Sequence, residues 1–220
     1  MMKAIKKIYN IIPEYAIKPL ILCVIFNFSV YSGARLFYKD ATFHNLTTFL
    51  DNKIPVVPIF TVIYLGSYIF WIINYLLISR INKNSCYRLI MADLLGKLIC
   101  GIIYIVFPTT NIRPNLVSSG IFVDMLKFLY SVDAANNLFP SIHCLVSWYC
   151  FAGLRNCKTI PKWYRAFSFF VAIMICISTV TTKQHVIIDV FGGIILAELT
   201  WQLSYYLQLY KAFKFINQEV

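Results

Sequence analysis

The chain has 220 residues, of which 60% are hydrophobic and 13% are charged, and its mean hydropathy is +0.70. Soluble globular domains average about 45–50% apolar and about 25% charged residues, so a soluble domain of this composition would lack the polar side chains to cover its surface. The abundance of apolar and aromatic residues also excludes a disordered chain. The composition therefore predicts a protein that is embedded in a membrane.

The net charge of +11 has a different meaning here than in a soluble protein, where it would indicate nucleic acid as a partner. The basic residues form short clusters between apolar runs, which is typical of cytoplasmic loops that face anionic headgroups. We therefore expect the bilayer as a partner and no nucleic acid. The seven cysteines show no CxxC spacing and are interpreted as small apolar residues, without a disulfide framework or a zinc site.

Apolar runs predict an all-α fold, with six transmembrane helices in one domain that covers residues 1–220. Crossing the hydrocarbon layer takes about 20 mostly apolar residues. The predicted spans cover residues 16–38, 54–79, 89–107, 141 to just before 155, 163–182 and 186–210. Residues 16–38 also have features of a signal peptide, but their length and the need for an even number of crossings favour a retained helix.

The distribution of basic residues predicts how these spans are oriented. With six spans both termini share one side, which carries 13 of the basic residues, while the opposite side carries 6 and Lys97 lies within a span. This asymmetry places both termini in the cytoplasm and the loops at about 35–53, 108–141 and 181–186 outside. Within the long outer loop, residues 121–130 are strongly apolar and predict an interfacial helix, which would either guide a lipid into a site or pack over the bundle.

Two of the three histidines lie at predicted outward-facing helix starts, where ionisable residues tend to mark function. His185 and Asp189 are four residues apart and would share one helix face, so the carboxylate would fix the imidazole tautomer and leave the other nitrogen free. His143 follows Pro140 and Ser141, and Ser141 is expected to cap a helix whose free amides favour a phosphate oxygen. His44 has no such surroundings and is interpreted as an ordinary loop residue.

On the same predicted outer side, but earlier in the chain, Arg113 precedes a proline and supplies a cation that can bind phosphate through two donors. In their order along the chain, these groups resemble the type 2 phosphatidic acid phosphatase (PAP2) superfamily of integral membrane enzymes. Its three sequence blocks are Lys-x6-Arg-Pro, Pro-Ser-Gly-His and Ser-Arg-x5-His-x3-Asp. The matching residues are Arg113-Pro114, then Pro140-Ser141-Ile142-His143, then Ser178, His185 and Asp189, within a resemblance that covers roughly residues 90–210 and places the catalytic blocks within about 106–189.

The departures from the family pattern are Ile142, which replaces the glycine of the second block, and the absence of two cations. The lysine of the first block falls on Val106, the arginine of the third block falls on Thr179, and Lys183 is the candidate for a partial replacement. A phosphate monoester carries nearly two negative charges, whereas a diester carries one. Fewer cations therefore fit a diester or headgroup-transfer substrate better than a simple monoester. The Asn-x-x-Pro-Ser-x-His and Gln-His-x-x-x-Asp forms also resemble the branch of lipid phosphotransferases that includes sphingomyelin and inositol-phosphorylceramide synthases.

The resemblance implies a mechanism that needs no metal or other cofactor. His185 would attack phosphorus and form a phosphohistidine, Asp189 would orient it, and His143 would act as general acid and base on a lipid phosphate substrate. Arg113, Ser141 and Lys183 would stabilise the phosphate oxygens. In a direct-transfer variant, His185 would instead deprotonate the acceptor hydroxyl.

Three alternatives compete with a PAP2-type hydrolase or phosphotransferase. The two histidines and Asp189 could ligate a metal. They could also form a proton relay in a transporter, which would be expected to place charges deep in several spans; Asp93, Lys97 and Glu198 are the candidates for such charges. The missing cations also fit a catalytically silent relative. Asp93 and Lys97 are four residues apart and are interpreted as a structural pair, and Gly192-Gly193 as a site of close helix approach.

Overall fold

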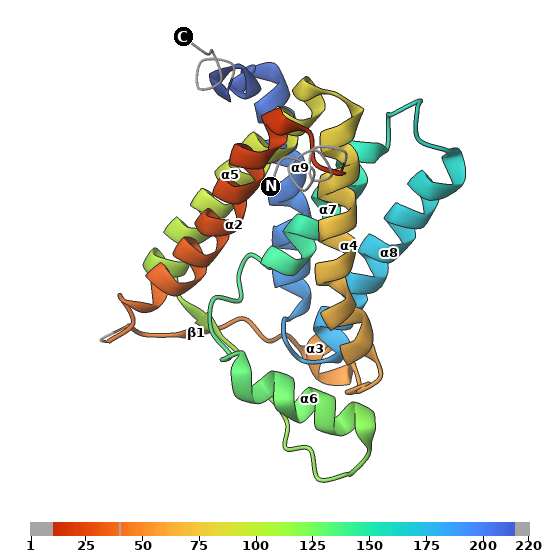
Figure 1. Cartoon of the computed structure of the whole chain (residues 1–220). Coiled ribbons are helices and arrows are strands. Elements are labelled where there is room, and N and C mark those ends of the chain that lie inside the picture. The colour runs from red at the N-terminus through yellow and green to blue at the C-terminus, as the bar shows by residue number, and fades with distance from the viewer. Residues whose placement is uncertain (1–10, 40, 214–220) are drawn as a thin grey trace, which may run out of the picture.

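The computed structural model describes residues 11–39 and 41–213, and in this part of the chain the architecture is helical (Figure 1). The prediction of an all-α fold is confirmed, with two strands of two residues each as the exception. The α-helices are α2 (Glu14–Arg35), α3 (Phe49–Lys53), α4 (Phe60–Ile81), α5 (Lys83–Val106), α6 (Ile121–Val132), α7 (Ile142–Leu154), α8 (Lys162–Thr181) and α9 (Ile187–Tyr206), followed by the short 3-10 helix η1 (Leu209–Lys211).

Five of these helices, α2, α4, α5, α8 and α9, are long and apolar enough to cross a membrane. They correspond to the first, second, third, fifth and sixth predicted spans. Helix α4 begins at Phe60 rather than at the predicted residue 54, because Pro55 and Pro58 disfavour helical backbone in the residues before them. Helix α5 begins six residues earlier than predicted, because the side chain of Asn82 caps it by accepting a hydrogen bond from the Ser85 amide at 2.8 Å.

The fourth predicted span corresponds to α7, which has 13 residues and is therefore about 20 Å long, against about 30 Å for the hydrocarbon layer. Helix α7 begins after its cap at Ser141 and ends before Arg155. It packs against α4, α5, α8 and α9, and eight of its residues are buried. Thus α7 is the central helix of the bundle, and its neighbours cover its sides (Figure 1).

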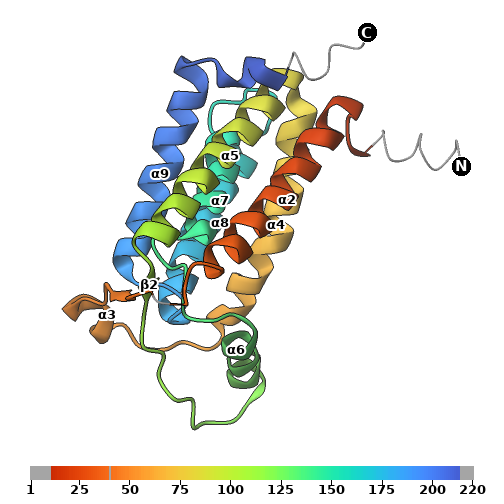
Figure 2. The same cartoon turned by 90° about the vertical axis from the view of Figure 1, so that its left-hand side faces the viewer.

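The remaining long helices pack around this centre. Helix α5 contacts both α2 and α9, and Figure 2 shows it between them. Helices α3 and α6 both lie at one end of the bundle, at the bottom of Figure 1. Strand β1 (His44–Asn45) lies near that end and pairs in parallel with β2 (Thr109–Thr110), with His44 opposite Thr109. The connections that are predicted to face outward therefore gather at the α3–α6 end.

The predicted pairing of Asp93 with Lys97 is confirmed within α5. Lys97 Nζ lies 2.7 Å from Asp93 Oδ2, and both side chains are buried where α5 packs against α2. The thiol of Cys23 in α2 donates a hydrogen bond to the same carboxylate. Because each charge compensates the other in an apolar environment, the pair is interpreted as a structural contact between α2 and α5.

Removal of one partner of this pair is expected to destabilise the bundle. The substitution Lys97→Met leaves an uncompensated buried carboxylate, so the free energy of unfolding should fall by about 3–5 kcal/mol. Unfolding of the purified protein by titration with sodium dodecyl sulfate, followed by tryptophan fluorescence, measures this change.

Two variants serve as controls for that measurement. The double substitution Asp93→Leu/Lys97→Met removes both charges and should recover most of the loss. Lys127→Met breaks the exposed pair with Asp124, whose atoms are 3.8 Å apart, and should change stability by less than about 1 kcal/mol. Equal effects of Lys97→Met and Lys127→Met would contradict the structural role of the buried pair.

Candidate active site

His185 lies in the loop between α8 and α9, and Asp189 lies in the first turn of α9. The Nδ1 atom of His185 is 3.3 Å from Asp189 Oδ2, and the Val186 amide donates to the same oxygen at 2.9 Å. The sequence analysis expected both residues on one helix, but α9 begins only at Ile187. The pair forms because the Asp189 side chain reaches back across the helix start, as a capping carboxylate does.

Asp189 also fixes the start of α7 relative to the start of α9. The Ser141 amide donates to the Asp189 backbone carbonyl at 3.0 Å, and Ser141 caps α7 by accepting from the Cys144 amide at 3.4 Å. A Cβ atom added to Gly193 would lie 2.5 Å from the Ser141 backbone carbonyl oxygen. The predicted close approach of helices at Gly193 is therefore confirmed, and it brings the second and third sequence blocks into direct contact.

His143, in the first turn of α7, is enclosed by aromatic rings of α4. Its ring stacks on Tyr64 with a centroid separation of 4.1 Å, and Trp71 and Tyr68 lie at 5.0 and 5.8 Å. The Nδ1 atom is 3.3 Å from the Tyr64 hydroxyl, whereas Nε2 is buried and has no hydrogen-bond partner among the described residues. One nitrogen of His143 is thus positioned by α4, and the other is left unpaired.

The two imidazoles converge on one another. Their ring centroids are 6.3 Å apart, and the planes are tilted by 54°. Because one ring comes from α7 and the other from the α8–α9 loop, this proximity is a property of the fold. It fulfils the geometric condition for both rings to act on a single small group.

Asp133 joins this cluster and was not identified from the sequence. Its carboxylate accepts a hydrogen bond from the Tyr31 hydroxyl of α2, and its Oδ2 is 3.5 Å from the Tyr64 hydroxyl. Arg35 in turn donates to the Tyr31 hydroxyl at 2.7 Å. The Tyr64 hydroxyl therefore lies between a carboxylate and His143. The only sequence signal is that Asp133 is the acidic residue of the long outer loop closest to the second block.

Arg113 reaches the site but is not free. Its Nη1 donates to the Asp133 backbone carbonyl at 2.5 Å, its Nη2 donates to Gln184 Oε1 at 2.6 Å, and the guanidinium lies 4.8 Å from the centroid of the Tyr130 ring. The structure thus places Arg113 against the residue that precedes His185. A phosphate at this position would have to share or replace these contacts.

Lys183 is turned toward α3 instead of the histidines. Its Nζ donates to the backbone carbonyls of Asp51 and Ile54, both at 2.7 Å, and its own backbone is left-handed with φ of 54°. The Asp51 side chain also accepts from the Ile187 amide at 2.7 Å. Burial lowers the pKa of Lys183 more than the nearby charge of Asp51 raises it. These contacts fix the loop that carries His185.

The residues at the positions of the two missing family cations, Val106 and Thr179, carry no charge. Val106 ends α5 and is 77% exposed. Thr179 is buried, and its backbone carbonyl accepts hydrogen bonds from the amides of Gln184 and His185 at 2.9 and 3.0 Å. Thr179 therefore supports the backbone of the His185 loop and adds no charge to the site.

Helix α6 covers this end of the bundle. Its buried residues Leu126 and Leu129 form an apolar cluster with Tyr64, and Tyr130 donates to the Thr182 carbonyl at 2.8 Å. The packing function expected for this segment is therefore present. It holds α6 against both α4, which encloses His143, and the loop that carries His185.

The charge of His185 depends on Asp189. Burial alone would lower the pKa of His185, but the hydrogen bond to Asp189 and the charge of that carboxylate outweigh burial and raise the pKa above 6.5. Among the described residues, no group of three or more His, Cys, Asp and Glu side chains is arranged to hold a metal ion.

Comparison with known proteins agrees with this arrangement. The family model of the PAP2 superfamily matches residues 88–213, a region that contains Arg113, both clustered histidines and Asp189. No curated protein and no solved structure matches the chain. Because the matched region covers more than half of the chain and includes the helix starts that carry both histidines, the chain belongs to the PAP2 superfamily.

Proposed function

We propose that the protein is a membrane-embedded lipid phosphatase or phosphotransferase in which His185 is the nucleophile and His143 is the general acid and base. The observation that carries the proposal is the 6.3 Å separation of two imidazoles from different segments, with Asp189 against Nδ1 of His185. Members of the superfamily are phosphoric ester hydrolases or related phosphotransferases, so this site would act on a phosphate ester.

The proposed reaction has two steps. Nε2 of neutral His185 forms a bond to phosphorus while the bond from phosphorus to the leaving oxygen breaks, and protonated His143 gives its proton to that oxygen. Water or an acceptor hydroxyl then attacks phosphorus, His143 takes the proton from the attacking oxygen, and the bond between phosphorus and His185 breaks. Asp189 holds the His185 tautomer through Nδ1 in both steps.

We assign phosphate binding to Arg113 and to the start of α7. The amides of Ile142 and His143 lie in the first turn after Ser141 and have no hydrogen-bond partner among the described residues, and such amides favour an anionic oxygen. Arg113 would exchange its contact with a carbonyl oxygen for a phosphate oxygen. Lys183 would contribute through the shape of the loop, because its ammonium is bound to two carbonyls.

The small number of free cations favours a phosphodiester lipid or a headgroup transfer over a simple phosphate monoester. Neither Val106 nor Thr179 supplies a positive charge, and Arg113 is already engaged. A diester oxygen pair carries one negative charge, whereas a monoester carries nearly two. A diester or headgroup-transfer substrate agrees with the resemblance of the histidine motifs to the sphingomyelin and inositol-phosphorylceramide synthase branch.

In the membrane, we propose that residues 1–220 form one domain with six crossings. The short helix α7 would complete the crossing together with the non-helical residues before Ser141. Both termini would lie in the cytoplasm, which follows from the distribution of basic residues. The histidines would then face the extracellular, periplasmic or lumenal side, and α6 would lie along the interface there.

Removal of either imidazole is expected to abolish turnover. His185→Ala and His143→Ala should each lower the rate by about 10² or more, because each removes an acid–base or nucleophilic group. The assay presents monoester, pyrophosphate and diester lipids to purified protein, with and without a diacylglycerol or ceramide acceptor, and measures released and transferred phosphate in the presence of a chelator.

Two outcomes of this assay would contradict the proposal at different levels. Near-normal turnover in either histidine variant would exclude the catalytic assignment. Efficient hydrolysis of phosphatidate with no action on diester lipids would leave the histidines in place but exclude the preference for diesters. His44→Ala is the matched control, because His44 stacks on Phe107 with a centroid separation of 4.2 Å and is not expected to take part.

The pH dependence of the activity should be set by the protonation of His185, whose pKa is raised by Asp189. Neutral His185 predominates above its raised pKa, so activity should rise as the pH increases through this pKa, which lies above the ordinary value of 6.5. Asp189→Asn removes the charge that raises this pKa, so the rising limb should move to lower pH while the maximum rate falls. A pH–rate profile of both proteins measures the shift, and an unmoved or higher rising limb in the variant would contradict the role of Asp189.

The Tyr64 hydroxyl is expected to position His143. Tyr64→Phe keeps the stacked ring but removes the oxygen that lies 3.3 Å from Nδ1, so kcat should fall about tenfold, which is less than the loss of about 10² or more expected when the acid–base group itself is removed, with KM unchanged. Tyr68→Phe is the control, since Tyr68 contacts His143 only through its ring edge. Equal kcat values of the two variants, or a change in KM alone, would contradict this role.

A further inference from the structure

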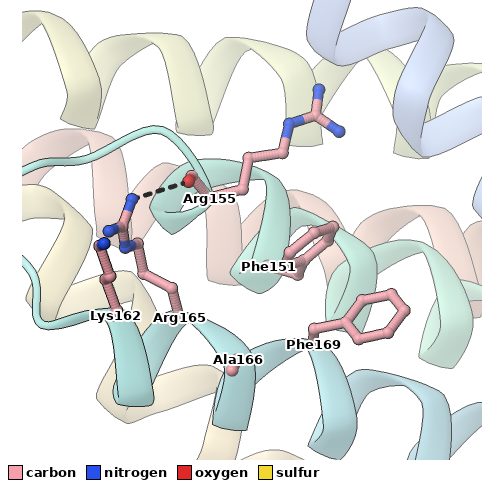
Figure 3. Close-up of a pocket in the computed structure, with 6 residues that line it drawn as sticks. All are labelled: Phe151, Arg155, Lys162, Arg165, Ala166 and Phe169. Carbon is pink, nitrogen blue, oxygen red and sulfur yellow. Dashed lines mark hydrogen bonds between the residues drawn. The ribbon is translucent and has the colours of Figure 1, made fainter.

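A cleft of about 470 Å³ lies between the end of α7 and the start of α8 (Figure 3). It is lined by Phe151, Arg155, Lys162, Arg165, Ala166 and Phe169. His143 lies in the first turn of α7 and the cleft at the last turn, so this cleft is at the other end of the bundle from the candidate active site. Nothing in the proposed reaction uses it.

The lining residues on α8 are ordered along the helix from charged to apolar. On α8, Lys162, Arg165, Ala166 and Phe169 have the spacing i, i+3, i+4 and i+7, which places them on one helix face. On α7, which runs in the opposite direction, Phe151 lies one turn before Arg155, the residue that follows the helix. The α8 wall of the cleft is therefore cationic at the start of the helix and apolar one to two turns deeper, and α7 adds an aromatic ring to the apolar part.

The apolar part of the cleft is lined by two aromatic rings and one small side chain. The rings of Phe151 and Phe169 are 5.0 Å apart at their centroids, and Figure 3 shows them next to each other, with Ala166 lining the cleft between Phe169 and Arg165 along α8. Phe169 is 43% exposed although it lies within a helix that is apolar enough to cross a membrane. An acyl chain is the natural contact for this surface in a bilayer.

The cationic part of the cleft is only partly neutralised. Arg155 binds Glu198 through two hydrogen bonds of 2.6 and 2.8 Å and points away from the cleft (Figure 3). Arg165 donates only to the Arg155 carbonyl, at 3.2 Å, and its buried Nε has no partner among the described residues. Within the same described part of the chain, Lys162 has no ion pair, and it lines the cleft three residues before Arg165, in the first turn of α8.

We propose that this cleft binds one anionic phospholipid, with the phosphate at Lys162 and Arg165 and an acyl chain against Phe151, Ala166 and Phe169. Two adjacent cations without a carboxylate favour an anion between them. The order from charged to apolar residues along α8 matches the order of headgroup and chain in a lipid. The proposal does not depend on the catalytic assignment, because it concerns a different end of the molecule.

Native mass spectrometry of the purified full chain in neutral detergent tests this proposal. The probes are dioleoylphosphatidylglycerol and dioleoylphosphatidylcholine at equal concentration. We expect the unmodified protein to retain one phosphatidylglycerol in preference to phosphatidylcholine. The double variant Lys162→Ala/Arg165→Ala should bind phosphatidylglycerol at least about tenfold more weakly, given the usual contribution of each basic residue to binding of anionic lipids.

A matched control separates a site from general attraction to a basic surface. Arg80→Ala/Lys83→Ala removes two exposed cations from the α4–α5 turn, outside the cleft, and should leave phosphatidylglycerol binding within about twofold of the unmodified protein, in line with the small contribution of diffuse surface charge. Equal losses in both double variants, or no loss in either, would overturn the proposal. Monodisperse elution of each variant in size-exclusion chromatography shows that it has folded.

A third variant tests the acyl-chain contact without a change of charge. Ala166→Phe fills the apolar part of the cleft and should weaken phosphatidylglycerol binding by about tenfold, the scale of one lost apolar contact site. A parallel arm adds inorganic phosphate at millimolar concentration. Displacement of the lipid by phosphate, together with unchanged binding in Ala166→Phe, would identify a site for free phosphate and overturn the lipid assignment. All readouts are binding measurements, so they are independent of catalytic activity.

Discussion

Asp189 connects the parts of the candidate active site through three hydrogen bonds. Its side chain holds the His185 ring and the Val186 amide, while its backbone carbonyl accepts from the Ser141 amide at the start of α7. The two helix starts that carry the imidazoles are therefore joined through one residue. Gly193 makes this junction sterically feasible, since a side chain there would collide with the Ser141 carbonyl. The distance between the two rings is thus set by backbone packing as much as by the histidines themselves.

The features that sequence analysis predicted well are those with a local signal. Apolar runs identified the five long helices, and the helix start at Ser141 follows from its capping chemistry. The pairing of His185 with Asp189 was predicted from their spacing. The contact forms even though His185 precedes the helix, because a carboxylate in the first turn reaches back over the cap. Helix boundaries were less predictable where prolines or an asparagine cap shifted the start by a turn or more.

The features that were missed depend on contacts between distant segments. Tyr64 and Asp133 are 69 residues apart, and no local pattern distinguishes Tyr64 from the other 14 tyrosines. The hydrogen-bond partners of the cations also could not be predicted from the sequence. Arg113 and Lys183 could be recognised as positive charges on the predicted outer side, but only the fold shows that backbone carbonyls already bind both of them. A sequence gives the charge of a side chain, whereas its availability depends on which acceptors the fold brings within reach.

The net charge of +11 therefore does not show how many cations are free to bind a ligand at each end of the bundle. At the histidine end, Arg113 is shared between a carbonyl and Gln184, and Lys183 is held by the loop near α3. At the opposite end, Lys162 and Arg165 have no carboxylate partner among the described residues. Of these four cations, the two that have fewer hydrogen-bond acceptors among the described residues lie at the end away from the histidines.

A substrate at the histidines would meet few free cations, whereas a lipid headgroup at the α7–α8 cleft would meet two. The physical requirements of the two ends consequently differ: a reacting phosphate needs hydrogen-bond donors and a proton donor in fixed positions, while an anionic lipid needs cations beside an apolar surface.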